Sequence, residues 1–409
     1  MQRDKPFTSM SGADITSRFS LDQIDHELLD ILSIRYTTCW RVSKHAITFP
    51  AAAGYKIKLQ IRHGHIEKVF AGKALTEAEL SELLAQIEGD LKDNRIEEYG
   101  VEILFAHRPV TGGFRFAALP MQILEAPAEA PRPPHLSGHH PFILEYPMHA
   151  HRTPELRMRR RHKNAIEWAW VLNALLHAGI TSYSSPRSPQ LWAIRHDVFT
   201  PFWASKSYSF TGSQIFSDVL SEQAALMPVL PAETYFSDIS NPAWADVPLD
   251  TFCLPDNLDR LVSTFVGLDG VRRRRFLRSP AAIYTARKLW DVSISSYFLM
   301  CVQAIETLVD RPSPVPCPEC KRDMGPGPTK LFRKFVDRYC SDSGVEEKVV
   351  SELYSVRSAL AHGHYLFQLD EAPWSLNMGA MIARAGEDET YRSAIRVAKT
   401  GLRNWLLAQ

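Results

Sequence analysis

Apolar and polar residues alternate along short segments in the first third of the chain. From Tyr55 to Ile61 every second residue is apolar, and Gly64 marks a turn shortly afterwards. A period of two predicts a strand that buries one face, so this segment and the residues after Gly64 predict a β-hairpin. Residues 99–107 and 112–124 are typical of two more strands.

Helical spacing of apolar residues interrupts these strands. Residues 20–33 carry the spacing, and so do residues 74–91, where Thr76 stands three positions before Glu79. This pair predicts a capping box, in which two side chains satisfy backbone donors at a helix start. The mixture predicts an α+β domain over residues 1–128.

The middle of the chain has a weaker pattern. Residues 125–141 are rich in proline and predict a linker or a long surface loop. Residues 163–179 predict an amphipathic helix that is closed by Gly179. We therefore assign residues 142–278 to a mixed, loop-rich middle region, which either stands alone or continues the first domain.

The last part of the chain is predominantly helical in pattern. Ser279 and Pro280 are typical of an N-cap and first helical position, and they predict a helix of up to about 30 residues. Three more segments carry a helical pattern: residues 329–340, 345–364 and 389–408. They predict an all-α four-helix bundle over residues 279–409, in an α+β multidomain protein.

Composition narrows the class of protein. The 409 residues are 45% hydrophobic and 23% charged, as in ordinary globular proteins, and 47 basic residues against 46 acidic ones give a net charge of +1. Attraction to nucleic acid must then be local. We see no apolar segment long enough to span a membrane and no secretory leader, so we expect a cytoplasmic protein without membrane partners.

The chemistry of the helical part concentrates in the stretch Val-Arg-Ser-Ala-Leu-Ala-His-Gly-His, which begins at residue 356. Arg357 lies upstream of His362 and His364. On a regular helix, five residues rotate the side-chain direction by about 140°, so Arg357 and His362 would diverge unless Gly363 alters the path. The alternative is a purely structural role for this stretch. In that case Arg357 would pair with Glu352 or with an acid on another helix, and the histidines would cap carbonyls at the helix end.

This arginine and histidine spacing, the glycine after the first histidine and the helical pattern around them resemble the HEPN superfamily, most closely its Apea-like branch. The resemblance covers roughly residues 280–409. It implies a metal-independent endoribonuclease, usually a homodimer, in which Arg357 and either His362 or His364 are catalytic. Glu306, in Gln-Ala-Ile-Glu-Thr-Leu-Val-Asp, also resembles a family feature. It would orient Arg357 or lie exposed at the surface.

One position departs from the family pattern. Many catalytic members carry Asn, Asp or His after the arginine, whereas this chain has Ser358, which can hydrogen-bond but cannot carry charge. Two hypotheses remain: an RNase that serves as a phage-defence or toxin effector under control of its N-terminal region, and a non-catalytic HEPN module that binds a nucleotide or a protein. In the first, the histidine transfers protons and the arginine binds phosphate.

Two basic clusters are candidates for RNA contact. Each would hold phosphates without reading sequence, or would be a solvated helix face balanced by nearby acids. The candidate residues are Arg159, Arg160 and Arg161 in the first cluster and Arg272, Arg273, Arg274 and Arg275 in the second.

The six cysteines are too sparse for a disulfide scaffold. Cys317 and Cys320 have the spacing of half a structural zinc site, for which two more ligands would have to come from elsewhere. The alternative is an unmetallated thiol pair. The predicted catalysis requires no cofactor.

Overall fold

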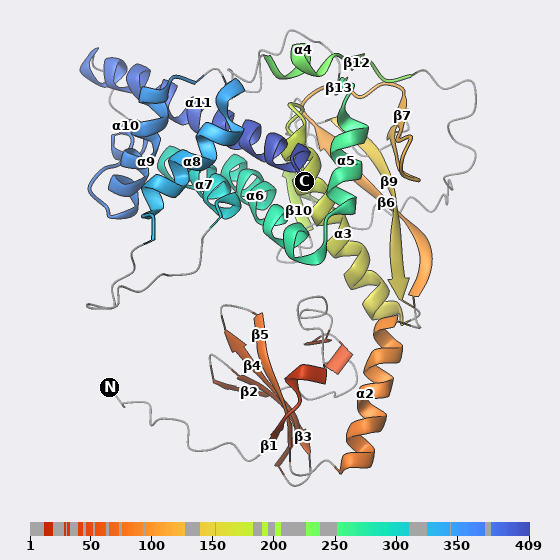
Figure 1. Ribbon diagram of the computed structural model, residues 1–409. Coiled ribbons are helices and arrows are strands. Elements are labelled where there is room, and N and C mark those ends of the chain that lie inside the picture. The colour runs from red at the N-terminus through yellow and green to blue at the C-terminus, as the bar shows by residue number, and fades with distance from the viewer. Residues whose placement is uncertain are drawn as a thin grey trace, which may run out of the picture. The chain divides into compact units, whose positions relative to one another are not determined.

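The computed structural model in Figure 1 divides into two compact units, Met1–Glu98 with Met148–Arg161 and Tyr99–Pro147 with His162–Gln409. The residues that the structure describes are 12–18, 28–29, 31–32, 40–43, 46–51, 54–62, 65–72, 76–92, 95–126, 140–151, 153–182, 190–194, 201–205, 226–237, 252–290, 292–310, 325–343, 345–372 and 378–409.

The first unit contains an antiparallel five-stranded sheet in the order β1-β5-β4-β3-β2. Its central pair is the predicted hairpin, in which Arg62 of β4 stands opposite His65 of β5. The structure thus confirms the strand pattern. The strands are β1 (Gly12–Asp14), β2 (Trp40–Ser43), β3 (Ala46–Ala51), β4 (Gly54–Arg62) and β5 (His65–Gly72), and the 3₁₀ helix η1 (Thr16–Arg18) follows β1.

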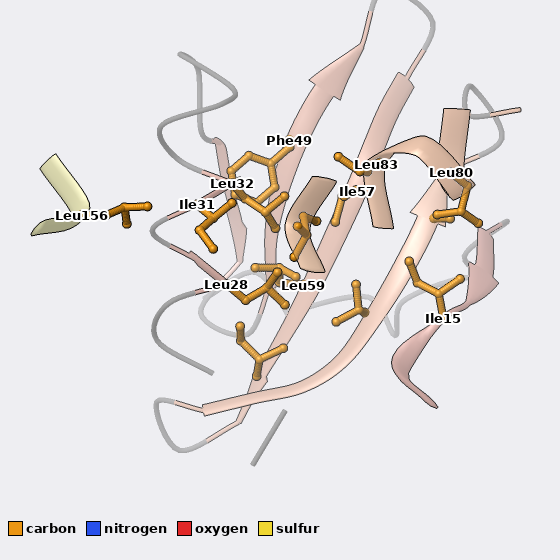
Figure 2. Close-up of a cluster of buried hydrophobic side chains, with 14 residues drawn as sticks. Ile15, Leu28, Ile31, Leu32, Phe49, Ile57, Leu59, Leu80, Leu83 and Leu156 are labelled. Atoms are coloured by element: carbon orange, nitrogen blue, oxygen red, sulfur yellow. The ribbon is translucent and has the colours of Figure 1, made fainter. Parts of the chain in front are cut away.

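A helix and a hydrophobic cluster complete this unit. Helix α2 (Glu77–Lys92) begins with the predicted capping box, since the Thr76 amide donates to Glu79 Oε2 at 2.9 Å and the Glu79 amide to Thr76 Oγ1 at 3.2 Å. Alternation along the strands places the apolar side chains on one face, where burial of their surface stabilises the unit. Figure 2 shows this cluster, which includes Leu28, Leu32, Phe49, Ile57, Leu59, Val69, Leu80, Leu83, Ile87 and Leu156.

A four-stranded sheet in the order β6-β9-β8-β7 lies mainly in the second unit. The strand predicted over residues 99–107 is confirmed as β6, whereas the single strand predicted over residues 112–124 is wrong, because β7 and β8 form an antiparallel pair there. The proline-rich residues 127–139 lie outside the described residues. The sheet consists of β6 (Arg95–Ala106), β7 (Gly113–Arg115), β8 (Gln122–Glu125) and β9 (His140–His151).

The elements that follow are mixed, as we predicted for the middle of the chain. Helix α3 (Pro154–Leu175) overlaps the amphipathic helix predicted over residues 163–179, but it begins earlier and already ends at Leu175, so Gly179, with a φ of 58°, does not close it. The others are β10 (Gln190–Ile194), β11 (Pro201–Ser205), β12 (Val229–Leu230), α4 (Ala232–Ser237), β13 (Leu254–Pro255) and α5 (Leu258–Gly267).

The C-terminal part is helical (Figure 1). Helix α7 packs against α6, α9 and α11, and α8 packs against α9 and α11. The chain is therefore a mixed α+β protein with strands toward its N-terminus and helices toward its C-terminus, as predicted. The elements are α6 (Gly270–Leu289), α7 (Ile294–Leu308), α8 (Pro328–Tyr339), η2 (Ser341–Ser343), α9 (Glu347–Ala361), α10 (Gln368–Glu371) and α11 (Met378–Leu407).

The prediction of one long helix from Ser279 is wrong. Helix α6 begins nine residues earlier, because the Asp269 side chain accepts from the amides of Val271 at 2.9 Å and Arg272 at 2.8 Å. Ser279 and Pro280 lie buried inside this helix. A second cap ends the continuity, since Ser293 Oγ accepts from the Ser296 amide at 3.1 Å and starts α7. A domain boundary at residue 279 would fall within α6.

None of the helices in the described residues is long and apolar enough to cross a membrane.

Candidate functional site

Arg357 lies on α9 and contacts an acidic residue of the neighbouring helix α7. Its Nη2 is 3.0 Å from Glu306 Oε2, and the side chains are 32% and 17% exposed, respectively. The guanidinium also lies over the Tyr354 ring, 5.9 Å from its centroid. Of the two partners predicted for this arginine, the acid on another helix is confirmed. An ion pair with this exposure holds the guanidinium in one direction and leaves it reachable from solvent.

The two histidines lie in the turn that ends α9. The Gly363 amide donates to Leu360 O at 3.1 Å and the His364 amide to Ala359 O at 2.9 Å, while Gly363 has a φ of 72°. These bonds and the left-handed glycine form a Schellman motif, which satisfies carbonyls at the helix end. The motif sets the directions of the residues on either side of the glycine.

Both imidazoles are exposed, and they lie beside each other. The ring centroids of His362 and His364 are 6.2 Å apart, with an angle of 33° between the ring planes. On a regular helix, two positions i and i+2 would point about 200° apart. The pairing of these rings is therefore a product of the turn at Gly363.

The segment after the histidines is fastened by a carboxylate of α11. Tyr365 donates its hydroxyl to Glu387 Oε1, and the Gln368 amide donates to Glu387 Oε2 at 2.8 Å. Burial raises the pKa of Tyr365, and the hydrogen bond and charge of Glu387 raise it further. The phenol thus stays protonated and keeps its donor role. Glu387 ties the residues after His364 to α11.

Asp370 provides a second anchor at the start of α7. Its carboxylate accepts from the Ile294 amide at 2.9 Å, the Ser295 amide at 2.7 Å and the Ser293 hydroxyl at 2.9 Å. Burial alone would raise the pKa of this carboxyl, but hydrogen bonds from Ser295, Ser293 and Ile294 together outweigh burial and lower it. The turn from His362 to His364, which we call the histidine turn, is thereby held between α9 on one side and fixed contacts to α7 and α11 on the other.

Arg357 and the histidines do not meet within one chain. The contacts that the structure shows for the Arg357 side chain are with Glu306 and Tyr354, and the contact shown for the His362 ring is with His364. The divergence of about 140° expected for a five-residue step on a helix is consistent with this arrangement. The structure thus forms two pairs, Arg357 with Glu306 and His362 with His364.

In the first basic cluster, the middle arginine is largely buried, and its RNA contact stays a prediction. Arg160 is only 8% exposed, and its Nη1 donates to Ala150 O at 3.1 Å. A buried guanidinium that donates to a backbone carbonyl supports the local fold. Arg159 and Arg161, on either side of it in α3, are exposed.

The second basic cluster is largely engaged inside the protein. Arg273 pairs with Glu167 at 3.2 Å and lies over the Phe265 ring at 4.4 Å. Arg275 contacts Asp310 and the carbonyl of Leu308.

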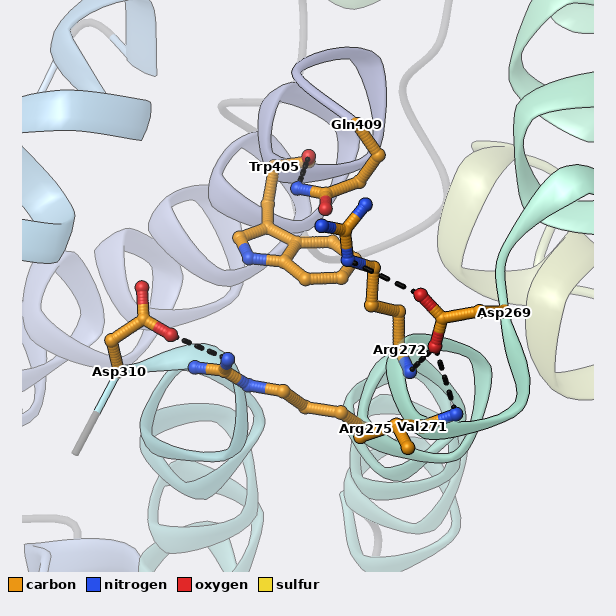
Figure 3. A network of polar contacts seen from close by, with 7 residues as sticks. All are labelled: Asp269, Val271, Arg272, Arg275, Asp310, Trp405 and Gln409. Atoms are coloured by element: carbon orange, nitrogen blue, oxygen red, sulfur yellow. Dashed lines mark hydrogen bonds and ion pairs between the residues drawn. The ribbon is translucent and has the colours of Figure 1, made fainter. Parts of the chain in front are cut away.

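Arg272 reaches back to its own helix cap, with Nε 3.4 Å from Asp269 Oδ2. Figure 3 shows Arg272 and Arg275 directed toward Asp269 and Asp310. Arg274 is half-buried on the same helix. For Arg272, Arg273 and Arg275, the geometry matches the alternative in which nearby acids balance the cluster. Their RNA contact stays a prediction.

The predicted zinc ligands Cys317 and Cys320 lie outside the described residues. Cys340, the next cysteine along the chain, is buried, with its Sγ 3.5 Å from Val397 O. Among the residues that the structure describes, no group of three or more histidine, cysteine or acidic side chains is arranged to hold a metal ion.

Asp370 and Glu387 were not predicted from the sequence. Helix caps are usually predicted from residues next to the helix in sequence. Asp370 instead caps a helix 75 residues away from it, measured to Ser295, and Glu387 contacts Tyr365 22 residues away.

Comparison with known proteins gives no relative: no protein-family model, no curated protein and no solved structure matches the chain.

Proposed function

We propose that the protein is a metal-independent endoribonuclease of the HEPN type, with its site at the end of α9. Helices α7, α8, α9 and α11 would be the four-helix bundle, and their mutual packing supports this arrangement. The observation that carries the proposal is a pair of exposed imidazoles on the same helix as a guanidinium that Glu306 holds in place.

These groups suit cleavage of RNA through its own 2′-hydroxyl. The reaction needs proton transfer from the nucleophile and stabilisation of charge on the phosphate. Under this proposal, His362 acts as general base or acid with His364 as the competing candidate, and Arg357 binds the phosphate. Glu306 engages one guanidinium nitrogen, which leaves other N–H groups of Arg357 to meet phosphate oxygens.

The separation of Arg357 from the histidines favours a composite site. In a homodimer with a twofold axis, the arginine of one protomer would face the histidines of its partner. The proposed partners are thus RNA and a second copy of the chain. We further propose a cytoplasmic effector in phage defence or toxicity, restrained by the N-terminal unit, which has a hydrophobic core of its own.

A second candidate function is a non-catalytic module that binds a nucleotide or a protein. The ion pair of Arg357 with Glu306 favours it, because part of the guanidinium is already engaged. Ser358 favours it as well, since an uncharged residue follows the arginine.

Incubation of the purified full-length protein with total RNA in EDTA separates these functions. We expect cleavage that persists in EDTA and falls by about 100-fold or more in Arg357→Ala and His362→Ala, which is the scale of losing a group that acts on the reacting atoms. His149→Ala is a matched control, because His149 is exposed on β9, away from α9 in sequence. Wild-type rates in both α9 variants would exclude this site, and nucleotide binding without cleavage would support the binding module.

A further inference from the structure

The histidine turn contains two imidazoles where the proposed reaction needs two proton transfers. His362 and His364 are both exposed, and their rings are 6.2 Å apart. The Schellman motif at Gly363 fixes this pairing from the α9 side, and Glu387 fixes the following residues from α11.

Cleavage through the 2′-hydroxyl takes place in line across one phosphorus atom. The attacking 2′-oxygen and the leaving 5′-oxygen lie on opposite sides of that atom, and each needs a proton acceptor or donor within about 3 Å. Two imidazoles separated by roughly two such contacts can each reach one of the oxygens. The measured ring separation of 6.2 Å fits this requirement.

We infer that His362 and His364 of the same chain act together on RNA, one as general base and the other as general acid. This inference rests on the proposed function and replaces the idea that the two histidines compete for one role. The dimer then has to supply only Arg357 from the partner, since the acid–base pair is complete in each chain.

The reaction balances without a further reactant. The neutral imidazole takes the proton of the 2′-hydroxyl while its oxygen forms a bond to phosphorus. The bond from phosphorus to the 5′-oxygen breaks, and that oxygen takes a proton from the imidazolium of the other histidine. The products are a 2′,3′-cyclic phosphate and a 5′-hydroxyl, and proton exchange with water restores both rings.

An activated substrate distinguishes the two roles. We would compare an RNA oligonucleotide with a ribonucleoside 3′-(4-nitrophenyl phosphate), whose leaving group departs without a proton. On RNA, we expect His362→Ala and His364→Ala each to lose about 100-fold or more, as for loss of one general acid or base. On the activated substrate, the variant that lacks the acid recovers to near the wild-type rate, and the variant that lacks the base stays impaired.

The pH dependence gives a second readout. The wild-type rate on RNA should follow a bell-shaped curve, and each alanine variant should lose one limb of it. If one variant cleaves RNA like the wild type, or if the activated substrate rescues neither variant, the paired assignment is wrong. If the proposed nuclease function itself is wrong, the wild-type protein cleaves neither substrate, and this result differs from failure of the paired assignment alone.

Substitution of the glycine tests the turn itself. A Cβ at Gly363 would meet no neighbouring atom within 4 Å, so Gly363→Ala introduces only the backbone strain of a positive φ. Gly363→Asn is the matched variant, because asparagine tolerates that conformation. We expect RNA cleavage to fall several-fold further in Gly363→Ala than in Gly363→Asn, with both proteins folded by circular dichroism. Equal rates in the two variants would contradict a role for the turn.

Discussion

Lys399, on α11, is an amine buried in the second unit. It is 6% exposed, and its Nζ donates to Asn173 O at 3.1 Å and to Leu176 O at 2.9 Å, at the end of α3. Burial, reinforced by the nearby charge of Arg287, lowers the pKa of this lysine to about 7. A neutral amine still donates two N–H bonds, so both carbonyls stay satisfied when the proton is lost.

This lysine makes stability depend on pH in a defined window. Between pH 7 and the ordinary value of 10.5, the folded state holds fewer protons than the unfolded state, so the free energy of unfolding rises with pH. We expect a slope of up to about 1.4 kcal/mol per pH unit. In Lys399→Met, this contribution to the slope disappears, although two carbonyls lose their donor. Urea unfolding at several values from about pH 7 to about pH 9.5 measures the slope.

Lys330→Met is the control, because Lys330 is exposed on α8. Its slope should equal that of the wild-type protein. A Lys399→Met protein that keeps the wild-type slope would show that the buried amine does not carry the pH dependence.

Besides its own N-cap Ser293, helix α7 receives a second cap from another part of the chain. The Asp370 carboxylate in α10 accepts hydrogen bonds from the backbone of Ile294 and Ser295, at the positive end of the α7 dipole. The same segment begins at the histidine turn. The cap thus couples the stability of α7 to the position of the proposed site.

Asp370→Asn should weaken that cap. We expect a loss of about 1 to 2 kcal/mol in the free energy of unfolding at pH 7, because the charged acceptor is lost while the shape is kept. The pKa of Asp370 is lowered in the folded state, so its contribution is complete above the ordinary carboxyl value of 3.8 and is lost as pH falls through the lowered value. Unfolding by urea at about pH 7 and about pH 3 measures this dependence.

Asp337→Asn, at an exposed position of α8, should change stability little at either pH. If Asp370→Asn destabilised the protein equally at both pH values, the charge would not be the source of the stabilisation.

Local patterns predicted the elements whose signals are local. The β4–β5 hairpin and the Thr76 capping box lie within single short segments, and both are confirmed. The long helix from Ser279 failed because Asp269 and Ser293 each start a helix, and a buried Pro280 is accommodated inside α6. The ion pair of Glu306 with Arg357 was one predicted arrangement. The pairing of the histidines could not be predicted, because it depends on the left-handed Gly363 and on contacts from α7 and α11.

At the scale of the whole chain, positive and negative charges nearly cancel, with 47 basic and 46 acidic residues. Several arginines of the basic clusters are also engaged internally, as Arg160, Arg273 and Arg275 show. Arg159 and Arg161 are exposed positions of the first cluster that can be tested for attraction to RNA.

The three consecutive arginines of α3 allow the contribution of exposed arginines to RNA binding to be tested. Arg159→Ala and Arg161→Ala should each weaken RNA binding and reduce the slope of log affinity against log salt by about one unit, because each variant neutralises one phosphate fewer. Arg160→Ala should instead cost about 2 kcal/mol of stability, because the buried Ala150 carbonyl loses its donor.

Fluorescence anisotropy with a labelled RNA, in a His362→Ala background that prevents cleavage, measures affinity from about 50 to about 300 mM salt. Unchanged affinity and salt slope in the Arg159 and Arg161 variants would exclude this helix face as an RNA contact and would leave the proposal for α9 standing.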